Sequence, residues 1–369
     1  MYSRGVTDGN ELAEKLKIKR RDVRWLLEQS VAWLLREQSD LAETRKSESS
    51  FESLAAQLCT TFRCLQEVHI VPGGGTDSEA EDAALSSRRG LAAARYFDEL
   101  AENADRLRKT LHVGVAGGES ILDAVSQFPD RQRQNVHYYA TALIGRGSLD
   151  NTSHVGPEIN STVAWSMSGR LPGHLHYGTV SPYDEELLRA EKIPHQRRFE
   201  IKAQLNGFAD SPSIRKVVDK MSKINVAFAG LGIVKPVDPL CPSSRTGLGR
   251  LTMTGLLNNL GITPGDLAAE GAVGDISYCL FNAEGTDVPT DPAAGRPMSP
   301  EYWRFFLTAG HFLTPKGINF YKDLVEQGDL VIVIAGTHKE RAIRAALKGK
   351  LFNVWFTDES AARALLSEA

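Results

Sequence analysis

Two glycine-containing turns place hydroxyl and basic side chains where a small anionic ligand could bind. The apolar run Leu330–Ala335 ends at a glycine, which a threonine, a histidine and a lysine follow, and Gly114–Ser120 likewise stands between an apolar run and a helical pattern. Backbone amides at the start of a helix attract anions, and such turns are where open α/β sheets bind ligands. The candidate binding residues are Gly117, Gly118 and Ser120 in one turn, and Gly336, Thr337 and Lys339 in the other.

Other chemistry-bearing residues give weaker signals. His174, His176 and Tyr177 stand close together in the sequence. Two histidines two residues apart without a third ligand are weak evidence for a metal site, so a place in a pocket wall is the better interpretation. No nucleophile-elbow pattern accompanies the serines and histidines. We expect no catalytic residue, no metal and no cofactor.

The amino-terminal segment has the spacing of a helix-turn-helix. Across Asn10–Leu27, apolar residues occupy the buried positions of two short crossing helices, with Ala13 as the small residue at their contact. Between Lys15 and Arg24 there are six basic residues and one acidic residue. Such a patch neutralises phosphates, and the start of the second helix can read base edges. The predicted DNA-binding residues are Lys19, Arg20, Arg21 and Arg24.

A plainer interpretation of this segment remains open. The same pattern fits a helical hairpin with a solvated charged face. Lys17 occupies the turn position where glycine is usual, and little sequence precedes the first helix to form the helix that normally comes before the motif. The DNA-binding module could therefore be truncated.

Composition indicates a soluble globular protein. Of 369 residues, 42% are hydrophobic and 24% are charged, and the net charge is −3, so any contact with nucleic acid must come from a local patch. The four cysteines fit neither a metal site nor a disulfide framework, which favours a reducing compartment. No signal-peptide pattern and no membrane-spanning run is apparent. We expect a cytoplasmic protein.

Buried strands recur along the chain with helices between them. This alternation predicts an α/β fold with a doubly wound, mostly parallel sheet covered on both faces. The predicted strands are 67–71, 111–115, 136–144, 226–229, 330–335 and 351–356, and the clearest helices are 85–107 and 339–347, with Thr357-Asp358-Glu359 capping a last helix. We expect a helix-turn-helix over residues 1–38, a linker over 39–53 and one large domain over 54–369.

With these segments in view, the chain resembles the SorC family of bacterial transcriptional regulators. The resemblance runs from about Tyr2 to Leu366. It implies an amino-terminal helix-turn-helix and an effector domain with a fold like glucosamine-6-phosphate deaminase and ribose-5-phosphate isomerase. Its anchors, in the family's order, are Gly114–Ser120, Ala229–Ile233, Gly271–Ile276 with Asn282–Gly285, Ala335–Lys339 and Phe356–Glu359.

The resemblance also implies further effector-binding residues. Gly230 and Gly232 correspond to a glycine pair that borders the ligand, and Asp275 to an acidic position whose carboxylate would accept hydrogen bonds from sugar hydroxyls. The family carries Ser-Trp-Gly-Thr-Thr where this chain has Ala-Gly-Gly-Glu-Ser, so a carboxylate, Glu119, replaces a hydroxyl residue and favours an unphosphorylated sugar or polyol. Arg146, after Gly145, could pair with Glu119 or reach an anionic effector.

The function predicted from these residues is an effector-responsive regulator of carbohydrate or polyol metabolism rather than an enzyme. Its partners would be operator DNA and a sugar, polyol or sugar phosphate, and it would act as a homodimer or homotetramer without a membrane partner. Two alternatives stay open. One is an isomerase-like or deaminase-like enzyme on the same fold, and the other is a ligand-binding oligomer that has lost DNA binding.

Overall fold

The computed structural model describes residues 50–74, 79–116, 119–128, 138–142, 221–234, 264–277, 279–288 and 317–367. Residues 54–369 form one compact unit, apart from residues 1–53. The predicted helix-turn-helix lies outside the described residues. Within the described ranges, no helix is both long enough and apolar enough to span a bilayer.

A mostly parallel sheet organises the large unit, as the sequence predicts. Six strands lie side by side with every neighbouring pair parallel, in the order β1 (Glu67–Val71), β8 (Val354–Asp358), β7 (Leu330–Ile334), β4 (Val226–Ile233), β2 (Leu111–Val115) and β3 (Tyr138–Ala142). Two short strands, β5 (Gly274–Ile276) and β6 (Cys279–Phe281), extend it as an antiparallel hairpin that pairs with the end of β4. The strand β4 therefore belongs to both the parallel sheet and the hairpin.

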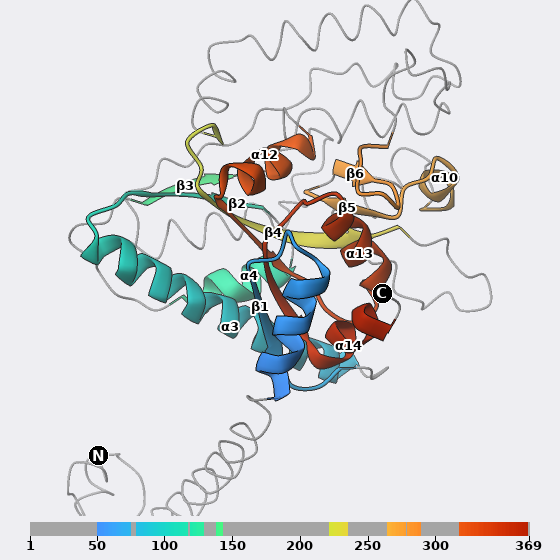
Figure 1. Cartoon of the computed structure of the whole chain (residues 1–369), viewed down its shortest axis with the longest axis horizontal. Coiled ribbons are helices and arrows are strands. Elements are labelled where there is room, and N and C mark those ends of the chain that lie inside the picture. The colour runs from blue at the N-terminus through green and yellow to red at the C-terminus, as the bar shows by residue number, and fades with distance from the viewer. Residues whose placement is uncertain are drawn as a thin grey trace, which may run out of the picture. The chain divides into compact units, whose positions relative to one another are not determined.

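Helices cover both faces of the sheet because its central strands are apolar on both sides. In β7, Ile332 and Ile334 face one core, and Val331 and Val333 face the other. The helices α3 (Glu79–Arg106) and α4 (Glu119–Ser126) cover the first core (Figure 1). The second is covered by a helix over residues 50–61, α10 (Pro264–Ala269), α12 (Asn319–Gln327), α13 (Glu340–Lys348) and α14 (Glu359–Ser367).

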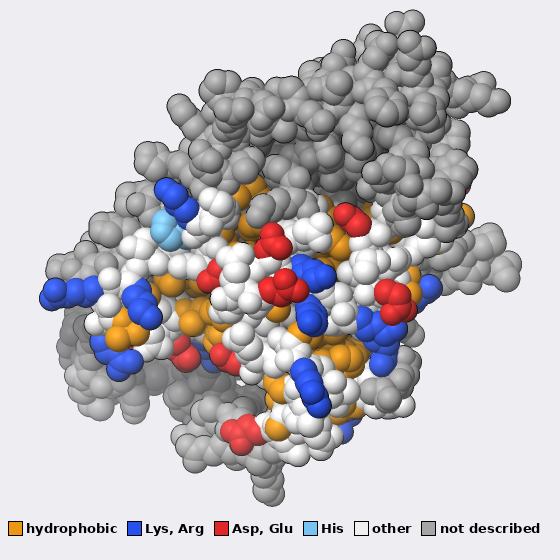
Figure 2. Space-filling view, turned by 45° about the horizontal axis from the view of Figure 1, so that its top comes forward, with side chains coloured by type: hydrophobic (Ala, Val, Ile, Leu, Met, Phe, Trp, Pro, Cys, Tyr) orange, Lys and Arg blue, Asp and Glu red, His pale blue; other side chains and the backbone are white. Residues whose placement is uncertain are grey.

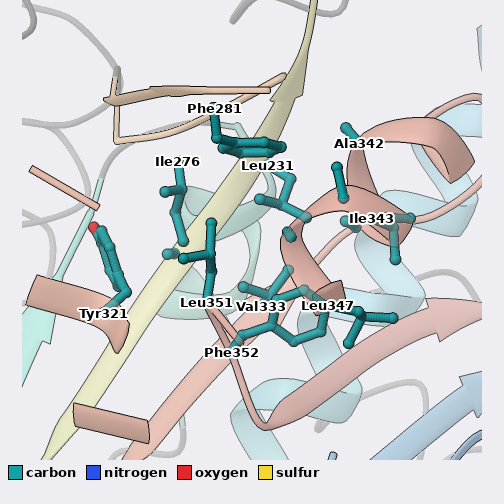
Figure 3. Close-up of a cluster of buried hydrophobic side chains, with 14 of the residues drawn as sticks. Leu231, Ile276, Phe281, Tyr321, Val333, Ala342, Ile343, Leu347, Leu351 and Phe352 are labelled. Atoms are coloured by element: carbon teal, nitrogen blue, oxygen red, sulfur yellow. The ribbon is translucent and has the colours of Figure 1, made fainter. Parts of the chain in front are cut away.

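The second core also holds the β5–β6 hairpin in place. Figure 3 shows Ile276 and Phe281 from the hairpin beside Leu231 of β4, with side chains of α13 to their right. Burying each of these large side chains contributes about 1.5–3 kcal/mol. The hydroxyl of Tyr321, a fully buried residue of α12, hydrogen-bonds to Ser277 Oγ in the turn of the hairpin. Burial raises the pKa of Tyr321, so the phenol stays neutral and can take part in this bond.

Asparagine side chains fix the starts of two strands. The sequence predicts a strand from Leu351, but β8 begins at Val354, so the predicted start is wrong. The residue before it, Asn353, is fully buried; its side-chain oxygen accepts from Val331 N at 2.8 Å and its amide donates to Asp329 O at 2.7 Å. Asn225 has the same role before β4, where its side-chain oxygen accepts a hydrogen bond from His112 N at 2.9 Å. The residues before β8 are as buried as a strand, so apolar content alone did not distinguish the turn at 351–353 from a strand.

Two glycines with left-handed backbone conformation provide a matched test of close packing. Gly285 has φ of 68° and a Cβ there would overlap the carbonyl oxygen of Ala345, whereas Gly328 has φ of 83° and open space around it. Gly328→Ala should cost about 1–2 kcal/mol for the backbone conformation alone. Gly285→Ala should lower the free energy of unfolding by clearly more, measured by urea denaturation. Equal losses would contradict the close contact between this loop and α13.

Candidate effector-binding site

The candidate site lies at the edge of the sheet where the parallel strands end. Because β1, β8, β7, β4 and β2 run in one direction, the segments that follow them meet at the same edge. The strand β2 leads to the start of α4, where Ser120 is half-buried, and β7 leads through the turn 335–339 to α13. Ser120 and the turn 335–339 therefore lie at this one edge.

The turn after β7 is held at several points. Ala335 O accepts a hydrogen bond from the buried Trp355 Nε1 at 2.9 Å, and Ala335 N donates to Phe356 O at 3.0 Å. Thr337 then donates twice to Asp358, from its backbone N at 2.8 Å and from its hydroxyl at 2.5 Å. Because the Thr337 hydroxyl donates its hydrogen bond to Asp358, it would act toward a ligand as an acceptor.

Asp358, the last residue of β8, is the common partner of this edge. Its fully buried carboxylate accepts from Arg89 Nη1 of α3 at 2.7 Å, from both Thr337 donors, and from Ala361 N at 3.0 Å. The bond from Ala361 is an N-cap, as predicted for α14. Burial lowers the pKa of Arg89 while the charge of Asp358 opposes that shift. A buried ion pair needs such additional donors, because its desolvation penalty is large.

Two glycines allow the chain to close around this carboxylate. A Cβ on Gly336 would overlap both Asp358 Oδ2 and Arg89 Nη1. A Cβ on Gly74, in the loop after β1, would lie 2.6 Å from Asp358 Oδ1 and 2.9 Å from Thr337 Oγ1. The role that the structure gives Gly336 is therefore close packing on the ion pair.

Lys339 crosses from α13 to the strand β4. It occupies the N-cap position of α13, and its half-buried side chain donates from Nζ to Leu231 O at 2.6 Å. A carbonyl bonded to an ammonium is a charge-assisted contact, stronger than one between neutral groups. The ammonium therefore lies next to the glycine-containing end of β4.

Gly230, Gly232 and Asp275 share one face of the sheet. Leu231 and Ile233 point into the core covered by α13, so the two glycines that alternate with them present the opposite face. Asp275 pairs directly with Gly232, which places its side chain on that same face. Asp275 is buried at 7% exposure. It is a carboxylate beside two residues that have no side chains.

The structure thus gathers most of the described candidates at one edge: Ser120, Gly230, Gly232, Asp275, Gly336, Thr337 and Lys339. Glu119 begins α4 at that edge. The remaining candidates lie outside the described residues: Gly117, Gly118, Gly145 and Arg146 for the effector, and Lys19, Arg20, Arg21 and Arg24 for DNA. His174 and His176 lie outside them too.

Sequence reasoning missed Arg89 and the part that Asp358 plays in this edge. A signal for Arg89 was present, because it stands four residues from Leu85 and four from Ala93, both on the buried stripe of α3. A charged residue in an apolar stripe of a helix indicates a buried partner. The identity of that partner, 269 positions away in the sequence, could not be deduced from spacing.

The chemistry of the edge suits a ligand with many hydroxyl groups. A carboxylate, an ammonium, a half-buried serine and open glycine backbone offer both donors and acceptors. Within the described part of the chain, no group of three or more His, Cys, Asp or Glu side chains could hold a metal ion. The arrangement can bind and orient a polyol by hydrogen bonds.

Comparison with known proteins agrees with this fold. Residues 317–367, which include β7, α13, β8 and α14, match the family model described as "Putative sugar-binding domain". Comparison of the sequence with curated proteins gives no match. The matched segment contains the turn that bears Thr337 and Lys339.

Solved structures with the same fold include three bacterial regulators. The full-length sorbitol operon regulator SorC from Klebsiella pneumoniae is similar at 20% identity and a TM-score of 0.60, over 99% of this chain and 95% of that one. A domain of a "possible sugar-binding transcriptional regulator" from Arthrobacter aurescens gives 15% and 0.57, over 85% and 97%. A DeoR family transcriptional regulator from Listeria monocytogenes gives 16% and 0.55, over 85% and 98%. The predicted fold class is confirmed.

The buried carboxylate of Asp275 should be needed for ligand binding. Asp275→Asn keeps the shape but removes the charge, and a charge-assisted hydrogen bond is worth about 1.5–3 kcal/mol. We expect carbohydrate-induced thermal stabilisation to be largely lost. The matched control is Glu284→Gln, an exposed carboxylate after β6. Equal thermal shifts in Asp275→Asn and the wild type would remove Asp275 from the site.

The two ends of α13 offer a second matched comparison. Lys339→Met removes the contact with Leu231 O and the ammonium at the edge, whereas Lys348→Met removes only an exposed pair with Glu284 at the other end. Lys339→Met should weaken carbohydrate affinity about tenfold, the equivalent of about 1.4 kcal/mol, in calorimetric titrations. Lys348→Met should leave it unchanged. The same loss in both variants would indicate a general effect on α13.

Proposed function

We propose that this chain is a sugar-responsive DNA-binding transcriptional regulator of the SorC type. The observation that carries the proposal is the gathering of Ser120, Gly232, Asp275 and Lys339 at the strand ends of a fold shared with sugar-binding regulators. The ligand would be a sugar, a polyol or a sugar phosphate. Its binding would select one arrangement of the chain over another and so alter DNA binding.

The proposed DNA contact is the amino-terminal basic segment. In the face seen in Figure 2, Lys and Arg side chains of the described residues are interspersed with Asp and Glu, and no continuous basic patch is visible among them. Mixed charge of this kind gives little attraction for a duplex. The concentration of Lys19, Arg20, Arg21 and Arg24 in the sequence is therefore the feature that supports DNA binding.

We further propose a cytoplasmic protein that acts without catalysis, as a homodimer or homotetramer. An operator read by two recognition helices requires at least two copies of the chain. Light scattering of the purified protein, alone and with DNA, measures the number of copies. A monomer bound to DNA would contradict this part of the proposal.

A thermal-shift screen tests the effector half of the proposal. The panel comprises glucose, fructose, sorbitol, glucose 6-phosphate, fructose 6-phosphate, sorbitol 6-phosphate and inorganic phosphate. A ligand that binds only the folded state raises Tm, and the stabilisation grows with the ratio of its free concentration to its Kd. We expect at least one carbohydrate to stabilise the protein more than inorganic phosphate does. A panel without any carbohydrate-induced shift would argue against a carbohydrate effector.

The basic segment should control DNA affinity and its dependence on salt. Arg20→Ala with Arg24→Ala removes two phosphate-neutralising charges, so the slope of log affinity against log salt should fall by about 2. The measurement is fluorescence anisotropy with upstream DNA at several salt concentrations. The control, Arg341→Ala with Arg363→Ala, changes two arginines outside this segment and should leave the slope unchanged. An unaltered slope in the first variant would exclude that helix from the contact.

A further inference from the structure

The helix α3 pairs with the residue that holds the β7–α13 turn, and it also packs on α4, the helix that carries Ser120. Toward the β7–α13 turn, Arg89 pairs with Asp358, whose carboxylate also holds the backbone N and the hydroxyl of Thr337. The turn is packed onto this pair so tightly that Gly336 has no room for a side chain. The position of Thr337, and of the Lys339 that follows it, therefore depends on a charge supplied by α3.

On the side of α4, the helix α3 is held by residues next to Arg89. Ser86 Oγ donates to Asp123 Oδ2 at 2.7 Å, and Gln127 Nε2 donates to Ser87 O at 3.1 Å. Gly90 lets the two helices approach closely, since a Cβ there would lie 2.9 Å from Ala124 N. The first turn of α4 contains the candidate residue Ser120.

The contacts in both directions come from one short stretch of α3, residues 86–90. Arg89 lies within this stretch and has a side-chain exposure of 12%. Its Nη1 donates to Asp358, and among the described residues its buried Nε has no hydrogen-bond partner. The contact that the structure gives its charge is therefore with Asp358, which in turn holds Thr337. This contact supports a positioning role.

We propose that Arg89 is a positioning residue of the effector site, which fixes the Thr337–Lys339 turn relative to the start of α4. The proposal rests on the proposed function, because that function places the ligand at this turn and at the start of α4. Without the guanidinium, Asp358 would be a buried charge with fewer donors, and it would repack or take up water. Either change releases the amide of Thr337 and moves Lys339 away from β4.

The test compares Arg89→Met with Arg95→Met, an exposed arginine of the same helix. Hydrogen–deuterium exchange of the protein without ligand should rise in peptides that cover residues 335–339 in Arg89→Met and stay unchanged in Arg95→Met. Arg89→Lys, which keeps the charge, should restore part of the protection. Exchange that rises equally in all strands would mean a general loss of stability and would overturn the positioning role.

A binding arm uses sorbitol, sorbitol 6-phosphate, fructose 6-phosphate and inorganic phosphate as probes in calorimetry. Arg89→Met should bind the probe recognised by the wild type about tenfold more weakly, the size of effect typical when an outer-shell partner of a binding group is lost. An affinity equal to that of the wild type would overturn the proposal. Inorganic phosphate separates recognition of a bare anion from recognition of the carbohydrate.

The two proposals fail in different ways. If the wild type binds none of the carbohydrate probes, the proposed function is contradicted for these ligands, and the exchange of residues 335–339 alone decides the role of Arg89. If Arg89→Met does not fold, Asp358→Asn removes the same ion pair from the other side. It should show the same local rise in exchange, and unchanged exchange there would refute the proposal.

Discussion

A single buried carboxylate, that of Asp358, organises the edge of the sheet on which the candidate site is built. It receives donors from a helix on one face, from the turn after β7 and from the first turn of α14. A buried carboxylate is costly unless its charge is compensated and its lone pairs are used. Because its donors come from three different segments, satisfying this one group fixes the relative positions of those segments.

Three segments at this edge carry different kinds of candidate binding group. The strand β4 brings open glycine backbone, β5 brings the carboxylate of Asp275, and the turn after β7 brings Lys339. The carboxyl ends of the parallel strands β4 and β7 lie together whatever their order along the chain, and β5 pairs with the end of β4. A site of the proposed kind would bind by several moderate hydrogen bonds to a fixed frame, which suits discrimination among sugars of similar size.

The sequence predicted the elements better than the contacts between them. Local signals were enough to predict the strand β7, the helix α13 and the cap of α14. These signals are an apolar run, helical periodicity and a capping aspartate. The start of β8 was predicted three residues too early because Leu351, Phe352 and Asn353 are buried without being in a strand. Gly232 and Asp275 were predicted from a family resemblance and Lys339 from its place after a glycine turn. The Arg89–Asp358 pair, being non-local, was found only in the structure.

In the proposed function, carbohydrate binding and DNA binding are coupled in one chain. Thermodynamic linkage requires that an effector which changes DNA affinity by some factor has its own affinity changed by DNA by the same factor. The decisive measurement is a pair of titrations on the full chain: upstream DNA with and without a saturating carbohydrate, and the carbohydrate with and without saturating DNA. Each ligand should change the affinity of the chain for the other by the same factor, of about 5-fold to 150-fold. Binding of both ligands with no shift in either titration would contradict it.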